Sequence, residues 1–335
     1  MNNCRHLLDW SAKNGTRVCL IDGGRGIQHT YHHITVEVRK TASFLKTLGI
    51  REGDIVCHHL YNSVDAVIVH MAIHYIGGVT CFLDPLLKPK GLAYYITDTR
   101  ARFLITHLSR QSIVADIPSH CNIIPIERSK EEIEVSIPLQ SAPHTLSRDD
   151  LCSLYYTSGT TGPPKGVMLS LGNISHSTRY LQEAFFKLQP EDRLICFVPF
   201  SHGFGSMTAL LPTIINGAAL IMMRSFHPRQ VLDAIDQYGG THILGVPSHY
   251  QQLLRYGEAH EALRKLKCAF CAAAPLQVSV AQAWWDATHL NLAEGYGCIE
   301  TSTALSIRNS KLPDPMGEVG FHKSEFVNIR IMDDT

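Results

Sequence analysis

The sequence predicts an α/β fold in which parallel sheets are flanked by helices and arranged in two lobes. Short apolar, strand-like runs alternate with longer runs of helical spacing, and this repeated β-α-β order predicts parallel strands with helices on both faces. A polar, irregular stretch over 129–149 separates two series of such units. We therefore expect two subdomains, over about residues 1–150 and 151–335, joined by that connector.

The elements of the first half follow from apolar periodicity and from glycine stops. Gly49 is placed to end the first predicted helix as a C-cap, and Gly77-Gly78 to stop the second. The predicted strands cover 16–22, 54–60, 79–83 and 101–106. The predicted helices cover 35–48, 63–76 and 89–99.

The second half repeats the alternation and shows no internal sequence repeat. The predicted strands cover 151–156, 192–198, 218–223, 242–246, 267–273 and 290–296. The predicted helices cover 171–188, 205–216, 228–238, 248–256 and 279–288.

Composition excludes several classes of protein. The 335 residues allow a large core, and the net charge of +0 indicates neither a nucleic-acid partner nor an anionic membrane. No apolar run reaches the roughly 18 residues of a membrane span. The N-terminus, Met-Asn-Asn-Cys-Arg-His, lacks the pattern of a signal peptide. We expect a cytoplasmic enzyme with no membrane span.

The cysteines and histidines predict neither a disulfide framework nor a zinc site. Cys268-Ala-Phe-Cys271 is a single pair inside a strand-like run, whereas a zinc site needs a second pair. His70 and His74 share a helical face, but Met71 replaces the glutamate of a His-Glu-x-x-His motif. We expect both to be packed or surface histidines, and only His202 has a functional context.

One polar loop carries most of the functional information, Tyr156-Thr-Ser-Gly-Thr-Thr-Gly-Pro-Pro-Lys-Gly166. Its glycines allow main-chain N–H groups to approach anionic oxygens, its hydroxyl groups add donors, and its lysine adds a positive charge. Because an apolar strand precedes the loop, it is expected to project from a sheet edge, a usual place for a nucleotide site. The loop therefore predicts polyphosphate binding.

The loop has two alternative interpretations. A Walker A loop has Gly-Lys-Ser/Thr at a helix start, whereas Pro163-Pro164 precede Lys165 here and Gly166 follows it. That spacing disfavours a P-loop NTPase. A Ser/Thr/Gly-rich surface turn would also fit the loop taken alone.

Three further segments accompany the loop in order: Pro199-Phe-Ser-His-Gly-Phe-Gly205, Ala272-Ala-Ala-Pro-Leu276 and Gly295-Tyr-Gly-Cys-Ile-Glu-Thr301. Together the four segments resemble the motifs of the adenylate-forming (AMP-binding) enzymes, in the acyl-CoA and aryl-CoA synthetase branch. The resemblance covers nearly the whole chain and implies the N-terminal domain of that fold over 1–335. That domain has two packed α/β subdomains with mixed or parallel sheets flanked by helices, plus a small distorted β-barrel.

The resemblance also implies an activity and its cofactors. ATP and Mg²⁺ would convert a carboxylic acid to an acyl-adenylate, and coenzyme A would then form a thioester with the acyl group. A close variant would load the phosphopantetheine of an acyl carrier protein instead. Another possibility is a non-catalytic nucleotide- or acyl-binding remnant, or one half of a split enzyme.

By the same resemblance, particular residues take particular roles. Lys165, His202 and Glu300 would be catalytic, and Glu300 with Thr157 would hold Mg²⁺, which prefers oxygen ligands. Tyr296, beside Gly297, would stack on adenine. Phosphates would be held by Thr157, Ser158, Gly159, Thr160, Thr161, Gly162 and Lys165, and the other side of adenine would be covered by Ala273, Ala274 and Pro275.

The acid itself is expected to be fatty or aromatic. Amino-acid-activating relatives use an aspartate to pair with the substrate ammonium, but positions 200–202 hold Phe, Ser and His. The predicted acid pocket is mostly apolar. It comprises Phe200, His202, Phe204, Val246, Tyr250, Phe270, Ala272 and Gly295.

The chain departs from the family pattern in two places. Ile299 stands where the family has a threonine, and Thr301 would face the same side only if the segment is extended. The chain stops at Val327-Asn-Ile-Arg-Ile-Met-Asp-Asp-Thr335, before the family's Thr-Gly-Asp segment and its small C-terminal lid domain. We expect the lid to be absent from this chain, and it could belong to a separate partner chain.

Overall fold

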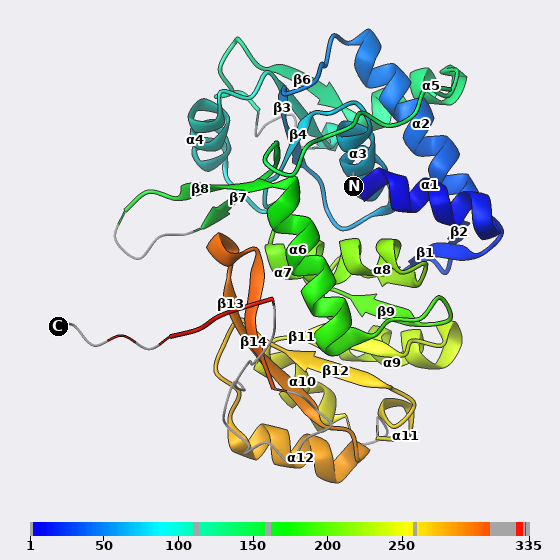
Figure 1. Cartoon of the computed structure of the whole chain (residues 1–335), viewed down its shortest axis with the longest axis vertical. Helices are drawn as coiled ribbons and strands as arrows, with labels where there is room; N and C mark the ends of the chain where they lie inside the picture. The colour runs from blue at the N-terminus through cyan, green and yellow to red at the C-terminus, as the bar shows by residue number, and fades with distance from the viewer. Residues whose placement is uncertain are drawn as a thin grey trace.

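The computed structural model describes residues 3–109, 114–157, 162–256, 260–308, 326–330 and 332. Their strands form a six-stranded and an eight-stranded sheet, one in each of two stacked lobes (Figure 1). Along the six-stranded sheet lie β6 (Asn122–Pro125), β5 (Phe103–Thr106), β3 (Ile55–His59), β4 (Val79–Phe82), β7 (Leu151–Thr157) and β8 (Lys165–Ser170). Neighbours in this sheet are parallel, except that β8 runs antiparallel to β7.

The eight-stranded sheet is parallel in its middle and antiparallel at both edges. Its central strands, such as β11, are buried along their length, as expected for a sheet covered on both faces. Along the sheet lie β14 (Thr303–Ile307), β13 (Leu292–Cys298), β12 (Cys268–Cys271), β11 (His242–Gly245), β9 (Arg193–Cys196), β10 (Ala219–Met222), β1 (Val18–Asp22) and β2 (Gln28–Thr30). The edge pairs β1–β2 and β13–β14 are antiparallel.

The sheets do not divide the chain at residue 150. Strands β1 and β2 come from the first 150 residues, yet β1 pairs with β10 in the eight-stranded sheet. Conversely, β7 lies beyond residue 150 and pairs with β4 of the six-stranded sheet through Thr80 and Ser153. The chain therefore crosses between the lobes twice, and its N-terminal strands belong to the lobe built mostly from the second half.

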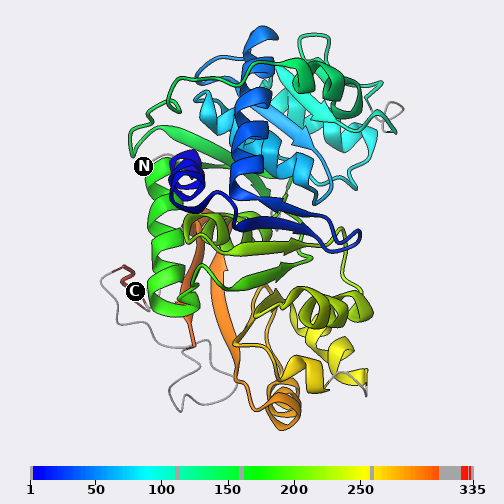
Figure 2. The ribbon, with the colours of Figure 1, turned by 90° about the vertical axis from the view of Figure 1, so that its right-hand side faces the viewer.

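Helices lie between the sheets and over their outer faces (Figure 2). Helix α2 contacts β1 and β2 as well as α3, and α3 packs on β3 and β4, so these helices join the two lobes. The helices are α1 (Asn3–Asn14), α2 (Tyr31–Thr47), α3 (Val64–Tyr75), α4 (Pro89–Thr99), α5 (Ile126–Val135), α6 (Leu171–Leu181), α7 (Gly203–Gly205), α8 (Leu211–Ile215), α9 (Pro228–Tyr238), α10 (Pro247–Arg255), α11 (His260–Leu263) and α12 (Val278–Thr288). Among the described residues, no helix combines the length and hydrophobicity needed to cross a membrane.

The predicted mixed α/β architecture is confirmed, with local corrections. The connector expected over 129–149 begins inside helix α5, whose buried Ile126 and Ile133 lie among mostly polar residues. The single helix expected over 205–216 is divided into α7, a π-helical turn over Ser206–Leu210, and α8. The helix expected over 171–188 is α-helical only as far as Leu181, the end of α6, and it continues as a π-helical turn over Gln182–Phe186. The small β-barrel stays a prediction.

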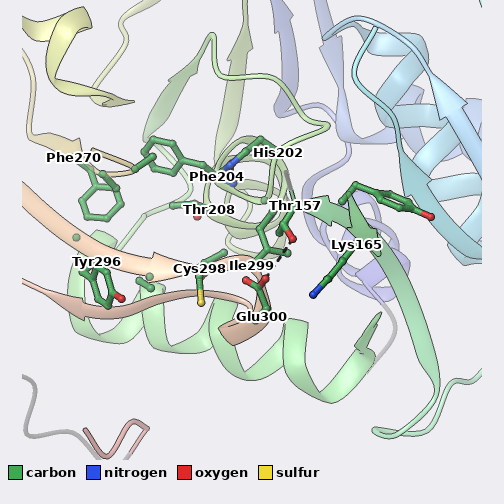
Figure 3. A pocket seen from close by; sticks show the side chains of 18 of the residues that line it. Thr157, Lys165, His202, Phe204, Thr208, Phe270, Tyr296, Cys298, Ile299 and Glu300 are labelled. Atoms are coloured by element: carbon green, nitrogen blue, oxygen red, sulfur yellow. Dashed lines mark hydrogen bonds between the residues drawn. The ribbon is translucent and has the colours of Figure 1, made fainter. Parts of the chain in front are cut away.

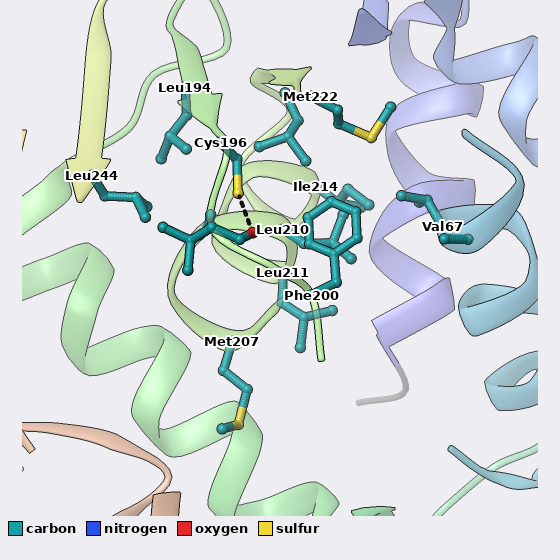
Figure 4. Packing of buried hydrophobic residues seen from close by; sticks show 14 of the residues in the cluster. Val67, Leu194, Cys196, Phe200, Met207, Leu210, Leu211, Ile214, Met222 and Leu244 are labelled. Carbon is teal, nitrogen blue, oxygen red and sulfur yellow. Dashed lines mark hydrogen bonds between the residues drawn. The ribbon is translucent and has the colours of Figure 1, made fainter. Parts of the chain in front are cut away.

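A continuous hydrophobic core runs between the lobes (Figure 4). Val67 of α3 belongs to the same buried cluster as Phe200, Leu210 and Ile214. Val67 comes from the six-stranded lobe, whereas the other three residues lie between β9 and β10 of the eight-stranded lobe. Polar groups are buried in the six-stranded lobe as well. His70 and His74 of α3 are packed in its interior, with their ring centroids 4.4 Å apart.

Candidate active site

A cavity of about 750 Å³ lies between the β7–β8 hairpin, helix α7 and the β13–β14 hairpin. One end is polar and the other is aromatic (Figure 3). Its lining comprises Tyr156, Thr157, Gly162, Lys165, His202, Gly203, Phe204, Thr208, Phe270, Ala272, Ala273, Gly295, Tyr296, Gly297, Cys298, Ile299, Glu300, Thr303 and Ala304.

The polar end is built by cross-strand pairing and by a turn from the other lobe. Thr157 at the end of β7 pairs with Lys165 at the start of β8, so both side chains stand at the mouth of one hairpin. The Thr157 hydroxyl donates to Glu300 Oε1 over 3.4 Å, and Figure 3 shows the Lys165 ammonium directed toward Glu300. The predicted phosphate-loop residues Ser158, Gly159, Thr160 and Thr161 lie outside the described residues.

A tight turn after β13 presents Glu300. Residues Ile299–Thr301 form a single 3₁₀ turn, so the segment is not extended. The Thr301 hydroxyl donates to the Cys298 carbonyl over 3.0 Å and accepts from the Cys298 N–H over 3.3 Å. Thr301 therefore stabilises the turn and does not line the cavity, whereas Ile299 does. The Thr301 hydroxyl therefore does not take the place of a threonine hydroxyl at position 299.

Gly297 is required by the close approach of β14. A Cβ at this position would lie 1.7 Å from the Thr303 carbonyl oxygen, at the point where the register of β13 and β14 shifts. Thr303 itself has φ of 126°. The backbone before Glu300 is thus closely constrained, and the Thr157 hydroxyl contacts the carboxylate itself.

His202 lies between the polar and aromatic ends, at the start of α7. Its Nδ1 accepts the N–H of Phe204 over 3.1 Å, and partial desolvation by the surrounding cavity wall lowers the pKa of the imidazole below its usual value. A neutral imidazole whose Nδ1 accepts must carry its proton on Nε2. Asn62 holds the preceding segment, since its Oδ1 accepts from Phe200 N and its Nδ2 donates to the Val198 carbonyl.

The aromatic end is formed by Phe204 of α7 and Phe270 of β12, together with Ala272 and Gly295. Thr208 adds one hydroxyl to this wall. The sequence prediction missed it, although it follows Phe204 by four residues on the same helical face. Three predicted pocket residues are not in the lining: Phe200 and Tyr250 lie in the core, and Val246 precedes α10.

The side predicted to hold adenine is open. Tyr296 is 58% exposed, and Ala273 lines the cavity with φ of +68°, a conformation that residues other than glycine rarely adopt. The carboxylate of buried Glu294 accepts the N–H of Leu276 over 2.9 Å and so anchors the segment that follows Ala273. Ala274 and Pro275 are exposed and outside the cavity lining.

A magnesium ion suits the oxygen atoms at the polar end. Mg²⁺ in nucleotide sites typically takes one or two carboxylates and completes its shell with phosphates and water. Glu300 and the Thr157 hydroxyl supply such donors next to each other. Within the described ranges, no group of three or more His, Cys, Asp or Glu side chains is placed to hold a metal by itself. Glu300 therefore fits a metal shared with a phosphate ligand.

Comparison with known proteins places these features in one family. The family model described as AMP-binding enzyme matches residues 7–335. A long-chain-fatty-acid–CoA ligase of Bacillus subtilis is 28% identical over 315 residues, covering 83% of this chain and 56% of that protein. A 4-coumarate:CoA ligase of Petunia hybrida is 28% identical over 309 residues, covering 87% of this chain and 56% of that protein. The chain thus spans about half the length of these curated relatives.

Solved structures show the same fold. ATP-bound MatB of Rhodopseudomonas palustris superposes with a TM-score of 0.87 at 25% identity, over 95% of this chain and 64% of that one. The inhibitor-bound N-terminal domain of FACL13 of Mycobacterium tuberculosis gives a TM-score of 0.86 at 20% identity, over 92% of this chain and 79% of that one. The second likeness is evidence for the fold alone.

Proposed function

The chain belongs to the AMP-binding enzyme family, and from that premise we propose that its cavity activates a carboxylic acid with ATP. The acid's oxygen would attack the α-phosphorus, pyrophosphate would leave, and an acyl-adenylate would form. The sulfur of coenzyme A would then attack the acyl carbon, releasing AMP and a proton. The observation that carries the proposal is that one cavity joins a cationic, hydroxyl-bearing end to an aromatic end.

The polar end would hold the phosphates of ATP. Lys165 supplies a full positive charge and Thr157 a hydroxyl, and together with Gly162 they surround the position where a polyphosphate would lie. The same role is proposed for Ser158, Gly159, Thr160 and Thr161, which belong to the same loop. A pre-positioned charge of this kind stabilises the negative charge that develops on the leaving pyrophosphate.

Glu300 would act through magnesium. When bound, the ion would neutralise phosphate charge and help to orient the nucleotide. The chain's own contribution is to hold the Glu300 carboxylate and the Thr157 hydroxyl side by side on two different hairpins. This arrangement couples the phosphate loop of one lobe to the last hairpin of the other.

Adenine would bind on the open side of the cavity. The Tyr296 ring offers a flat, exposed face at the rim, beside the side-chain-free Gly297. The main chain of Ala273, continued by Ala274 and Pro275, would cover the other face of the base. Small residues in that segment allow a planar base to approach closely.

His202 would orient the acid. Its Nε2 proton can donate to a carboxylate oxygen, because Nδ1 already accepts the Phe204 N–H. The acid's tail would then extend toward Phe204, Phe270, Ala272 and Gly295. A fatty or aromatic acid fits this apolar wall, and the similar ligases of fatty acids and 4-coumarate support that substrate class.

The acyl acceptor is proposed to be coenzyme A, as in the names of the similar ligases. A carrier-protein phosphopantetheine offers the same thiol and is the alternative. Both would need the acyl-adenylate, so the first step is the one to test.

A second candidate is a protein that binds nucleotide or acyl groups without turnover, or that needs a separate lid chain. One observation favours it, namely that Ile299 brings a methyl-bearing side chain where a hydroxyl would contact the α-phosphate, and Thr301 is bound to Cys298 instead. This candidate predicts ATP binding without pyrophosphate exchange.

Acid-dependent exchange of pyrophosphate into ATP distinguishes the two candidates. The chain would be assayed with benzoate, a fatty acid and an amino acid, alone and with a lid domain supplied in trans, beside the Glu300→Gln variant. Exchange that requires an apolar acid and is lost in the variant supports the ligase. ATP binding without exchange under every condition supports the non-catalytic candidate.

A further inference from the structure

We propose that the aromatic end of the cavity admits only a compact acid, a single aromatic ring or a short aliphatic chain, and that Phe270 sets this limit. The inference rests on the proposed function, since it assigns the acid to that end. It narrows the substrate class, because a long fatty acid would be excluded.

Phe270 closes the end of the cavity as part of a packed aromatic cluster. Its ring centroid lies 5.0 Å from that of Phe185, 5.6 Å from Phe186 and 5.9 Å from Phe204. The side chain is 1% exposed, so the space behind it is filled by protein. An acyl chain that reached Phe270 would meet this cluster rather than a continuing channel.

The ring has little freedom to move aside. A Cβ on Gly295 would lie 2.4 Å from Phe270 Cζ, so the ring already rests against the bare backbone of β13. Tyr250 fixes the main chain from behind, because its hydroxyl donates to the Phe270 carbonyl over 2.6 Å. Close-packed interiors accommodate extra methylenes only by straining rotamers or backbone. A long chain would therefore have to displace a ring that rests against β13 and whose main chain is anchored by Tyr250.

The size of the cavity agrees with a short acid. Its volume of about 750 Å³ is shared between the acid and the part of the nucleotide that does not extend past the open rim at Tyr296. Pockets of roughly 300–1,000 Å³ typically enclose a single drug-sized ligand. With adenosine and phosphate along the Tyr296, Lys165 and Glu300 side, the remaining room is that near Phe204 and Phe270.

Acyl-sulfamoyl adenosines test the inference directly, since they mimic the acyl-adenylate without reacting. Acetyl, benzoyl and dodecanoyl analogues share the adenosine part and differ only in the tail. By calorimetry, we expect the chain to bind the dodecanoyl analogue at least about tenfold more weakly than the benzoyl analogue, because the long tail overpacks the aromatic end. In Phe270→Ala, dodecanoyl affinity should rise about tenfold and benzoyl affinity should fall several-fold.

Phe103→Ala is the matched control, because Phe103 is as buried as Phe270 but lies on β5 of the other sheet. It should leave the order of the three affinities unchanged. Phe270→Leu gives a second, milder variant if the alanine variant does not fold. Wild-type binding of the dodecanoyl analogue as tight as the benzoyl analogue, or no gain in folded Phe270 variants, would overturn the inference. Failure of all three analogues to bind would instead overturn the proposed function.

Discussion

Lys165 stands opposite Thr157 on the β7–β8 hairpin, with its ammonium directed toward Glu300. Lys165→Ala removes one charge-assisted contact to a phosphate, worth about 1.5–3 kcal/mol, and should weaken ATP binding by roughly 10- to 100-fold. Because Lys165 is exposed, the melting temperature should hardly change. Calorimetric titration with Mg-ATP and a thermal melt would measure the two quantities.

Lys46→Ala provides the control for this variant. Lys46 is an exposed lysine on α2, away from the cavity lining, so its removal tests for a general charge effect. Equal ATP affinity in wild type and Lys165→Ala would mean that the loop is a structural turn and not a phosphate site.

Ile299 lines the cavity beside Glu300, where a threonine hydroxyl could donate to the α-phosphate. Ile299→Thr should raise the rate of acid-dependent pyrophosphate exchange, by at most about one to two decades, since it restores one donor of about 1.5–3 kcal/mol. Ile299→Val introduces a side chain of the same shape as threonine but without the hydroxyl, so it should give no gain in the exchange rate. A faster valine variant, or an unchanged threonine variant, would contradict the assigned position of the α-phosphate.

Strands β12 and β13 are paired in parallel, and Gly295 of β13 lets the Phe270 ring of β12 rest on the backbone. Gly295→Ala should lower the free energy of unfolding by about 1–3 kcal/mol, because its methyl group overlaps the ring. In the Phe270→Ala background the same change should have a smaller effect, giving a coupling of about 1 kcal/mol or more. Urea unfolding of the four proteins measures this cycle.

Gly91→Ala in α4 is the control for that cycle, since a Cβ there meets only an ordinary contact with Leu87. It should not destabilise the protein. Additive effects of Gly295→Ala and Phe270→Ala would show that the two residues do not contact each other as described.

The sequence alone predicted the bounds of elements that carry their own start signal and a regular spacing of apolar residues. The helices predicted over 89–99 and 228–238 match α4 and α9, because a proline opens each and apolar spacing continues to its end. The edge strands β2, β6, β8 and β14 were missed. Their burial is mixed, so they lack the apolar run that marks a central strand. Their pairing is set by contacts with a neighbouring strand.

The residues that line the cavity were predictable where they belong to one of the four sequence motifs. They were less predictable where the packing of the surrounding core determines the direction of a side chain. Lys165, His202, Phe204, Tyr296 and Glu300 all line one cavity, as expected from four ordered segments. Phe200 was predicted beside the acid but lies in the core between the lobes (Figure 4), in the buried cluster that also contains Val67 of α3. The hydrogen bond from the Thr301 hydroxyl to the Cys298 carbonyl also could not be predicted, because it depends on the 3₁₀ turn over Ile299–Thr301, which sequence spacing does not specify.

Across the whole molecule, stability should fall in mild acid because histidines are buried in the six-stranded lobe. Burial lowers the pKa of His58 to about 3 and of His74 to about 4, and that of His70 falls well below 6.5. The unfolded chain, with ordinary histidines, binds more protons below pH 6.5. The unfolding free energy should therefore be level above that pH and fall below it, by about 1.4 kcal/mol per pH unit for each imidazole.

His70→Leu tests the origin of this slope. Neither ring nitrogen of His70 has a hydrogen-bond partner among the described residues, so the variant should keep or gain stability at pH 7. Urea unfolding between pH 7.5 and 4.5 should show a shallower slope than wild type, whereas His32→Leu, at an exposed position, should show the wild-type slope. An unchanged slope in His70→Leu would mean that other groups cause the acid sensitivity.

A crystal structure of the chain with benzoyl-sulfamoyl adenosine tests most directly whether one cavity receives both the nucleotide and the acid. We predict adenine against Tyr296, the sulfamoyl group within hydrogen-bonding distance of His202 Nε2, and the benzoyl ring against Phe204 and Phe270. Glu300 and Lys165 should face the position that the leaving pyrophosphate would occupy. A ligand bound outside this cavity, or bound in it with the benzoyl ring at the Lys165 end, would contradict the account.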